Sequence, residues 1–198
     1  MKVLKLIFTI IAIILITYQD SYAQISKGGI PESFTNKEIN NIFSVVEMPA
    51  FNIDSLLNIE AKEIEEARPF RFGYAIDVDM GLKNNGTWQT LSNGDKVWRL
   101  KIYSEGAFSI NLIFDEFWLP EGARFFLYNE DHSMILGAFT SDVSNNEYYT
   151  FSTDLVQGNT VVLEYYEPAY TSEGIINIDK VIHGYKDMFK SDGLGLSG

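Results

Sequence analysis

The sequence predicts a mostly β fold, an antiparallel β-sandwich of the jelly-roll or immunoglobulin-like kind, preceded by one short helix. From Tyr74 onward, apolar and polar residues alternate with a period of two, which places successive side chains on opposite faces of a strand. Clusters rich in Gly, Asn, Asp and Pro separate about nine such runs, and turns at this spacing are typical of sandwiches. Aromatic residues make up 14% of the chain, and many lie within the alternating runs.

Residues 1–23 have the layout of a secretory signal peptide. Lys2 and Lys5 precede an apolar run, and the small residues Ser21 and Ala23 suit a cleavage site. The apolar run is about thirteen residues long, which is shorter than the roughly 20 residues that a membrane-spanning helix needs. We therefore expect a mature chain that begins at Gln24, is secreted or periplasmic, and keeps no membrane attachment after cleavage.

Three segments flank the sandwich. Residues 24–50 contain a Gly-Gly pair and two prolines, and they are interpreted as an extended or partly ordered arm. Residues 51–70 are predicted to form a helix, since Asp54 can cap its start and apolar residues follow at helical spacing. Pro69 can end it, because a proline disfavours helical geometry in the residue before it, Arg68. Residues 187–198 are interpreted as a Gly-rich linker or a point of truncation.

The β-sandwich domain is predicted over residues 71–186. Trp98, Leu100 and Ile102 alternate with polar neighbours, as do the apolar residues of 108–114. One face of each of these strands is therefore expected to point toward the core. Other stretches with strand-like composition are residues 124–128, 134–139, 148–152, 160–166 and 175–183.

Charge and cysteine content exclude several classes of function. The formal net charge is −12, and the signal peptide carries two lysines and one aspartate, a net of +1, so its removal leaves −13. Such an acidic chain repels nucleic acid and anionic membranes. There is no cysteine, which excludes disulfide bonds and zinc sites built on thiolates.

The segment 118–129 (WLPEGARFFLYN) raises the question of a catalytic carboxylate pair, because acidic residues surround it. Leu119 to Gly122 has Pro and Gly at the positions that suit a type I turn, which would place Glu121 at a solvated tip. Catalysis by paired carboxylates needs one acid in an apolar pocket. The segment is therefore interpreted as the corner of a hairpin, and no catalytic residue is assigned.

The two histidines lack the surroundings of a catalytic or metal-binding residue. His132 follows Glu130 and Asp131, but three adjacent residues in a turn rarely converge on one ion. His183 is interpreted as a hydrogen-bonded surface histidine. The G-x-S-x-G motif of a nucleophilic serine does not occur.

Calcium is a better metal candidate than a metal held by His132. Asp77 and Asp79 place oxygen ligands at alternate positions, and Asp142, Ser144 and Asn146 do the same. Neither run has the complete loop pattern that ends in a bidentate Glu. Calcium at the edge of the sandwich is retained as a hypothesis.

Several stretches between Arg71 and Tyr185 follow one another in a recognisable order. They are RFG (71–73), GTW (86–88), GDKVWRLKIYSEGAFSINLIFDEFWLPEGARFFLYNED (94–131), LGAFTS (136–141), VQGNTVVLEYYEP (156–168) and INIDKVIHGY (176–185). Together they resemble the N-terminal region of secreted bacterial trypsin-fold serine proteases of the lysyl endopeptidase type. The resemblance implies a non-catalytic pro-region or accessory domain, whose partner is a downstream protease domain in the same polypeptide. None of the matching positions is catalytic in that family, and the protease domain lies outside this chain.

The resemblance also implies a processing site, because a lysine-specific protease would cut its own precursor after an exposed lysine. Lys190 is the best-placed candidate and Lys186 the second.

The alternative function is a stand-alone secreted module that binds carbohydrate or protein through aromatic side chains. Trp88, Trp118, Tyr148 and Tyr166 are its candidate residues. Consecutive residues of a strand face opposite ways, so the pair at 148–149 is expected to send one ring to each face.

Overall fold

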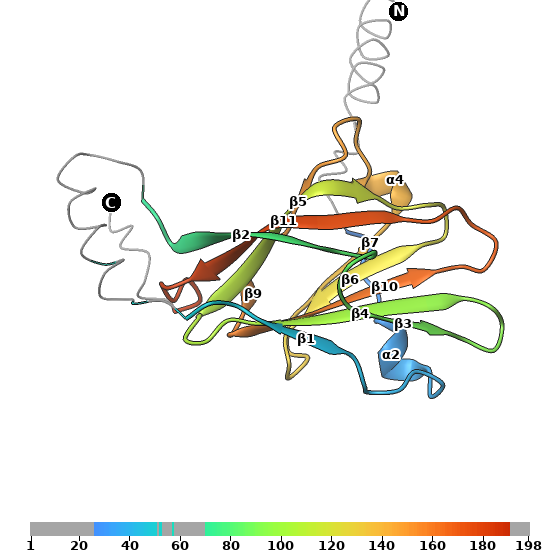
Figure 1. Ribbon diagram of the computed structural model, residues 1–198, viewed down its shortest axis with the longest axis horizontal. Helices are drawn as coiled ribbons and strands as arrows, with labels where there is room; N and C mark the ends of the chain where they lie inside the picture. Colours follow the sequence, from blue (N-terminus) through green and yellow to red (C-terminus); the bar gives the residue numbers. More distant parts are fainter. Residues whose placement is uncertain (1–25, 51, 53–56, 58–69, 191–198) are drawn as a thin grey trace, which may run out of the picture.

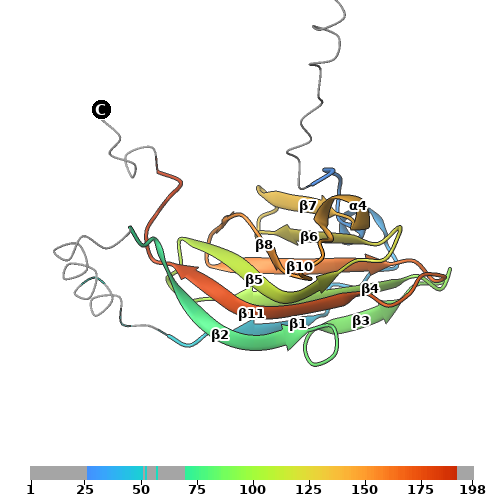
Figure 2. The same ribbon diagram turned by 90° about the horizontal axis from the view of Figure 1, so that it is seen from above.

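The computed structural model describes residues 26–50, 52, 57 and 70–190. Within these residues the chain forms two β-sheets packed against each other, with only short helices, and is therefore a β-sandwich (Figures 1 and 2). In this part of the chain no helix has the length and apolar character needed to cross a membrane. The predicted signal peptide, most of the predicted helix at 51–70, and residues 191–198 lie outside the described residues.

The first sheet has six strands in the order β1-β4-β10-β6-β7, with β3 also paired to β4. Its strands are β1 (Ser44–Glu47), β3 (Thr87–Thr90), β4 (Lys96–Tyr103), β6 (Arg124–Tyr128), β7 (Ile135–Phe139) and β10 (Thr160–Glu167). The second sheet has five strands in the order β2-β11-β5-β8, with β9 also paired to β5. Its strands are β2 (Gly73–Gly81), β5 (Ser109–Trp118), β8 (Phe151–Ser152), β9 (Val156–Gln157) and β11 (Ile175–Gly184).

The strand order identifies the sandwich as a double-sheet jelly roll. The four strands β4-β10-β6-β7 face the four strands β2-β11-β5-β8, and the chain crosses repeatedly from one sheet to the other. All neighbours within these two sets pair antiparallel. The topology therefore decides between the two kinds of sandwich that periodicity left open. One pair departs from the predicted antiparallel pattern, because β1 joins β4 in parallel.

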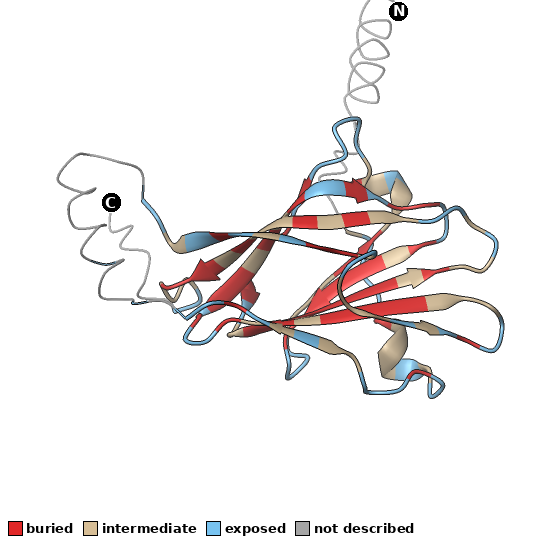
Figure 3. Cartoon of the chain, in the orientation of Figure 1, coloured by how far each residue is buried: buried red, intermediate tan, exposed pale blue. Residues whose placement is uncertain are grey.

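The core lies between the sheets, and buried residues occur along strands of both of them (Figure 3). Many of these core residues are aromatic. The prediction that Trp98, Leu100 and Ile102 face the core is confirmed, since all three are fully buried. Val97 and Arg99, on the other face of β4, are buried as well. Phe117 and Phe125 reach the same core from opposite sheets, with ring centres 5.6 Å apart. Because the chain has no cysteine, this apolar core carries the stabilisation of the fold.

The described part of the predicted arm, residues 26–50, packs against the outer face of the first sheet. It contains the short helix α2 (Glu32–Thr35) in addition to β1. Phe34 and Phe43 of the arm pack on apolar residues of that face. The backbones of Lys27 and Gly28 exchange hydrogen bonds of 2.9 and 3.0 Å with Ala138 on β7. The arm therefore crosses the outer face of this sheet from the edge strand β7 to the other edge, where its residues 44–47 join the sheet as β1.

The turn after β5 is shifted by one residue from the type I turn predicted at Leu119 to Gly122. The Ala123 amide donates to the Pro120 carbonyl at 3.1 Å, so Pro120 is the first residue of the turn and Gly122 the third. Gly122 has φ +82°, a left-handed conformation that suits glycine at this position of a type II turn. Glu121 remains exposed, as predicted.

Candidate functional site

The chain leaves the sandwich after β11, where the two predicted processing lysines lie. The Lys186 amide donates to the Phe72 carbonyl at 3.3 Å, and its ammonium lies 4.1 Å from the centre of the Phe70 ring. Lys186 is therefore held against the domain. Lys190 lies beyond these contacts, its side chain is 75% exposed, and its ion pair with Asp187 at 3.6 Å is local. Of the two lysines, Lys190 is the more accessible.

The four aromatic residues predicted as one binding surface do not share a face. Trp88 on β3 donates its indole N–H to the Leu82 carbonyl at 3.0 Å. Tyr166 on β10 lies under the Arg124 guanidinium, 4.4 Å from its ring centre, and donates its hydroxyl to Asp95 at 2.5 Å. Burial, reinforced by this hydrogen bond, raises the pKa of Tyr166 to about 12. Trp88 and Tyr166 therefore each have structural partners of their own.

Trp118 and Tyr148 belong to a different place, the end of β5 and the loop that follows α4 (Ser141–Ser144). The strand predicted over 148–152 is wrong in its first half, because β8 begins at Phe151. Tyr149 has φ +56°, so the chain turns here, and both Tyr148 and Tyr149 are exposed. The expectation that one of the two rings would enter the core is therefore also wrong.

The first pair of calcium candidates lies on the exposed side of β2. The Lys180 ammonium is 2.7 Å from the Asp77 carboxylate, where a cation would otherwise sit. The Asn177 amide donates to Asp79 at 3.1 Å and to Asp115 at 3.2 Å. The two carboxylates thus have different partners, one an ammonium and the other an amide.

The second set of calcium candidates also does not converge. Asp142 is paired with Lys27 of the arm and accepts a hydrogen bond of 2.7 Å from Thr140, and these hydrogen bonds lower the pKa of its carboxyl. Ser144 is buried, and Asn146 caps the backbone of its own loop. Among the described residues, no three His, Cys, Asp or Glu side chains are placed to hold a metal ion. Calcium binding stays a prediction.

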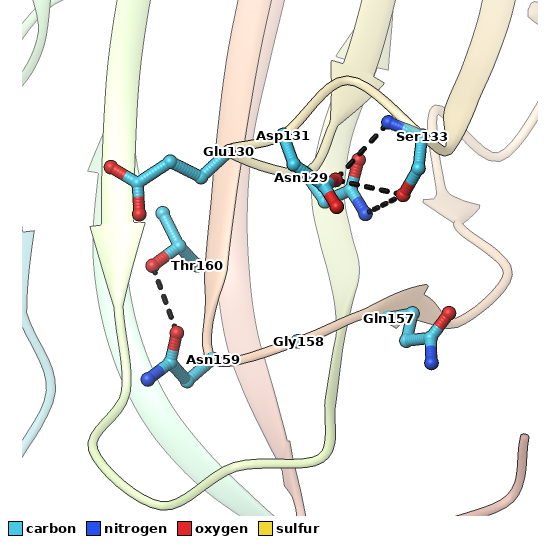
Figure 4. A pocket seen from close by; sticks show the side chains of 8 residues that line it. All are labelled: Asn129, Glu130, Asp131, Ser133, Gln157, Gly158, Asn159 and Thr160. Carbon is cyan, nitrogen blue, oxygen red and sulfur yellow. Dashed lines mark hydrogen bonds between the residues drawn. The ribbon is translucent and has the colours of Figure 1, made fainter.

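The acidic residues of the β6–β7 turn border a polar hollow of about 460 Å³, opposite the turn between β9 and β10 (Figure 4). The Ser133 hydroxyl donates to Asp131 at 2.7 Å and accepts from the Asn129 amide at 2.8 Å. Glu130 pairs with Lys101 on β4 at 2.6 Å. These side chains stabilise the turn on which they lie, so they are not a convergent acid-base pair.

His132 is fixed against the arm. Its ring stacks on Phe34 with centres 4.1 Å apart and meets the edge of Tyr128 at 5.2 Å. Its φ of +60° is left-handed, a conformation that is uncommon for residues with a side chain but is enriched for histidine. The ring is therefore part of the packing between the β6–β7 turn and the arm.

His183 is fully buried, which contradicts its interpretation as a surface residue. It lies on β11 opposite Ile110, and the Ser104 hydroxyl is 2.7 Å from its Nδ1. Burial disfavours the charged ring and lowers the pKa of His183 below its usual 6.5. The alternating pattern of β11 places this residue on the inner face.

The free energy of unfolding is expected to fall as the pH drops below about 6.5, because the unfolded state then binds a proton that native His183 resists. Carboxyl groups with lowered pKa values contribute only at more acidic pH, below about 4. Urea unfolding at intervals from pH 8 to pH 5 measures the effect. The His183→Gln variant should show a smaller pH dependence in this window, and an unchanged slope would contradict the assignment.

A buried charged group under the arm was missed from the sequence. Glu164 on β10 is fully buried, and Arg99 lies directly opposite on β4. Glu164 accepts hydrogen bonds from the Ser33 amide at 3.0 Å and the Tyr128 hydroxyl at 3.3 Å. Arg99 donates to the Asn40 carbonyl of the arm. The sequence feature that could have revealed this group is Glu164 itself, the one charged residue in the otherwise apolar run VVLEYY (161–166).

A second cation on this face also contacts the arm. Arg124 on β6 donates to Glu32 of α2 at 2.5 Å. Glu38 of the arm accepts hydrogen bonds from the backbone and side chain of Ser92, at 2.9 and 2.7 Å. These bonds lower the pKa of the Glu38 carboxyl. The arm is thus attached through polar contacts along much of its length.

A comparison of the chain with models of known protein families finds no match.

Proposed function

We propose that this chain is the non-catalytic pro-region or accessory domain of a secreted serine protease of the lysyl endopeptidase type. Residues 71–185 resemble the N-terminal region of such proteases, which supports the protease class. The layout of residues 1–23 supports secretion. Its partner would be the protease domain downstream in the same polypeptide. Its role would be to assist folding of the protease or to block it until the two are separated by cleavage.

The position of Lys190 carries the proposal. An endopeptidase needs a segment that can extend through its cleft, and segments with few tertiary contacts meet this need most easily. Just after β11, the Tyr185 and Lys186 amides both donate to the Phe72 carbonyl, which lies just before β2. Cleavage after Lys190 leaves these bonds undisturbed, whereas cleavage after Lys186 requires the Lys186 side chain to leave the Phe70 ring and enter the protease.

The test mixes the purified chain, residues 24–198, with the mature form of a lysine-specific protease of this type. We expect reduced hydrolysis of a chromogenic lysyl substrate, and an early cut after Lys190 that precedes any cut after Lys186. Mass spectrometry of the first fragments identifies the site. The cut after Lys190 should be at least tenfold faster, because Lys186 must first detach from Phe70 and Phe72, at a cost of about 1.4 kcal/mol or more.

Lys190→Gln and Lys186→Gln are the matched variants. The first should abolish the early cut, and the second should leave it unchanged. The chain alone should not hydrolyse the substrate. Unchanged protease activity, together with no improvement in the yield of refolded protease, would contradict the pro-region role even if Lys190 is cleaved.

A further inference from the structure

We propose that Trp118 and Tyr149 form the stacking platform of a binding site for a neutral oligosaccharide. The proposal is independent of the protease assignment. It concerns the C-terminal end of β5, at Trp118. It rests on an exposed pair of rings, on a loop that holds them, and on a nearby groove that has both apolar and hydrogen-bonding side chains in its lining.

The rings form a surface that a sugar can cover. Their centres are 5.4 Å apart with 34° between the planes, and Trp118 and Tyr149 are 37% and 45% exposed. Tyr148, next in the loop, is 74% exposed. The face of an aromatic ring carries partial negative charge, and the C–H groups on one face of a pyranose can pack against it. Two exposed rings this close together therefore suit a sugar chain.

The loop carrying the tyrosines is tied to β5. Asn145 exchanges two hydrogen bonds with the backbone of Leu119, at 2.8 and 2.7 Å. The Tyr149 carbonyl accepts from the Phe117 amide at 2.7 Å. Tyr149 keeps a left-handed φ of +56°, which is unfavourable for a residue with a side chain and persists only when its surroundings impose it. Rings fixed in this way lose little conformational freedom on binding.

A groove of about 570 Å³, within the size range of small-molecule sites, is lined by residues that adjoin the two tyrosines in their loop. Asn146 and Thr150, from the loop that carries Tyr148 and Tyr149, line this groove. Asp115, on the same strand as Trp118, lines it as well. Ser152 and Asp179 line it further along. Carboxylates accept hydrogen bonds from sugar hydroxyls, and the hydroxyls of Thr150 and Ser152 can donate or accept. The combination of stacking rings and hydrogen-bonding groups is typical of carbohydrate recognition.

The charge of the groove selects the class of sugar. Asp115 and Asp179 line it, and Glu116 is exposed next to Asp115. An anionic polysaccharide would meet repulsion here, whereas a neutral one offers hydroxyl donors. The loop also does not offer its backbone to a peptide strand, since the amides of Tyr148 and Tyr149 both donate to Asn146. A neutral oligosaccharide fits these features best.

The test measures binding of cellohexaose, chitohexaose and xylohexaose to the purified chain, by calorimetry and by tryptophan fluorescence. At least one of them should bind. Trp118→Ala and Tyr149→Ala should each weaken that binding at least tenfold. Trp88→Ala is the matched control, because Trp88 is comparably exposed but lies on the other sheet, and it should stay within twofold of the wild type.

Asp115→Asn and Tyr148→Ala change exposed side chains, so they keep the proposal testable if a ring variant fails to fold. Each should weaken the binding at least threefold with an unchanged thermal midpoint. Absence of binding by all three oligosaccharides would overturn the proposal, as would equal binding by all the variants. Binding of a proline-rich peptide through the same rings, without any saccharide binding, would also overturn it in favour of a protein-docking surface.

Discussion

Glu164→Ala is expected to lower the free energy of unfolding by about 3–5 kcal/mol, the range for removing one member of a buried charged pair. The substitution leaves Arg99 buried opposite an alanine, without the negative charge that favours its charged form. It also deprives the Ser33 amide and the Tyr128 hydroxyl of their acceptor. Urea unfolding followed by tryptophan fluorescence measures the loss.

A double variant separates the cost of an unpaired charge from the loss of packing. Arg99→Met combined with Glu164→Leu removes both charges and keeps most of the apolar volume, so it should be more stable than Glu164→Ala alone. Hydrogen exchange should also show faster exchange at the Ser33 amide in Glu164→Ala. A loss below about 1 kcal/mol in that variant would contradict the role assigned to the pair.

Phe117→Ala is expected to destabilise the fold by about 3–5 kcal/mol, because it opens a cavity at the centre of the aromatic core. The Phe117 ring stacks on Phe151 with centres 4.4 Å apart. Phe114 lies 5.4 Å and Phe125 5.6 Å from it, so three aromatic contacts are lost together. Thermal and urea unfolding of the same samples check the size of the effect.

Two variants control for this prediction. Phe117→Leu keeps much of the volume and should cost clearly less than Phe117→Ala. Phe108→Ala removes a ring that is 44% exposed in a turn, and it should change stability by about 0.5 kcal/mol or less. A similar loss in Phe108→Ala and Phe117→Ala would show that the core does not centre on Phe117.

Much of the sandwich was predictable because its strands alternate. Trp98, Leu100 and Ile102 on β4 were expected to face the core, and they do. The alternation failed to predict the fate of Arg99, which lies on the other face and is also buried. Periodicity describes a strand with one covered face, whereas the arm covers the second face of β4.

The candidate sites were less predictable because they depend on how separate loops meet. Trp118 was a candidate because it is aromatic. Its contact with Tyr149 depends on a left-handed turn that breaks the expected strand. Asp77 was a candidate calcium ligand, yet a lysine from β11 reaches it. Neither contact joins residues that are close in sequence.

The sequence by itself determined the class of fold, since the period of two, the turn residues and the absence of cysteine allow a sandwich stabilised by its core. Only the tertiary structure decided the jelly-roll order, the burial of His183 and Glu164, and the accessibility of Lys190 relative to Lys186. The physical reason is that periodicity is a local property of a strand. Strand order and burial depend on contacts between segments far apart in the chain, such as Ser33 with Glu164.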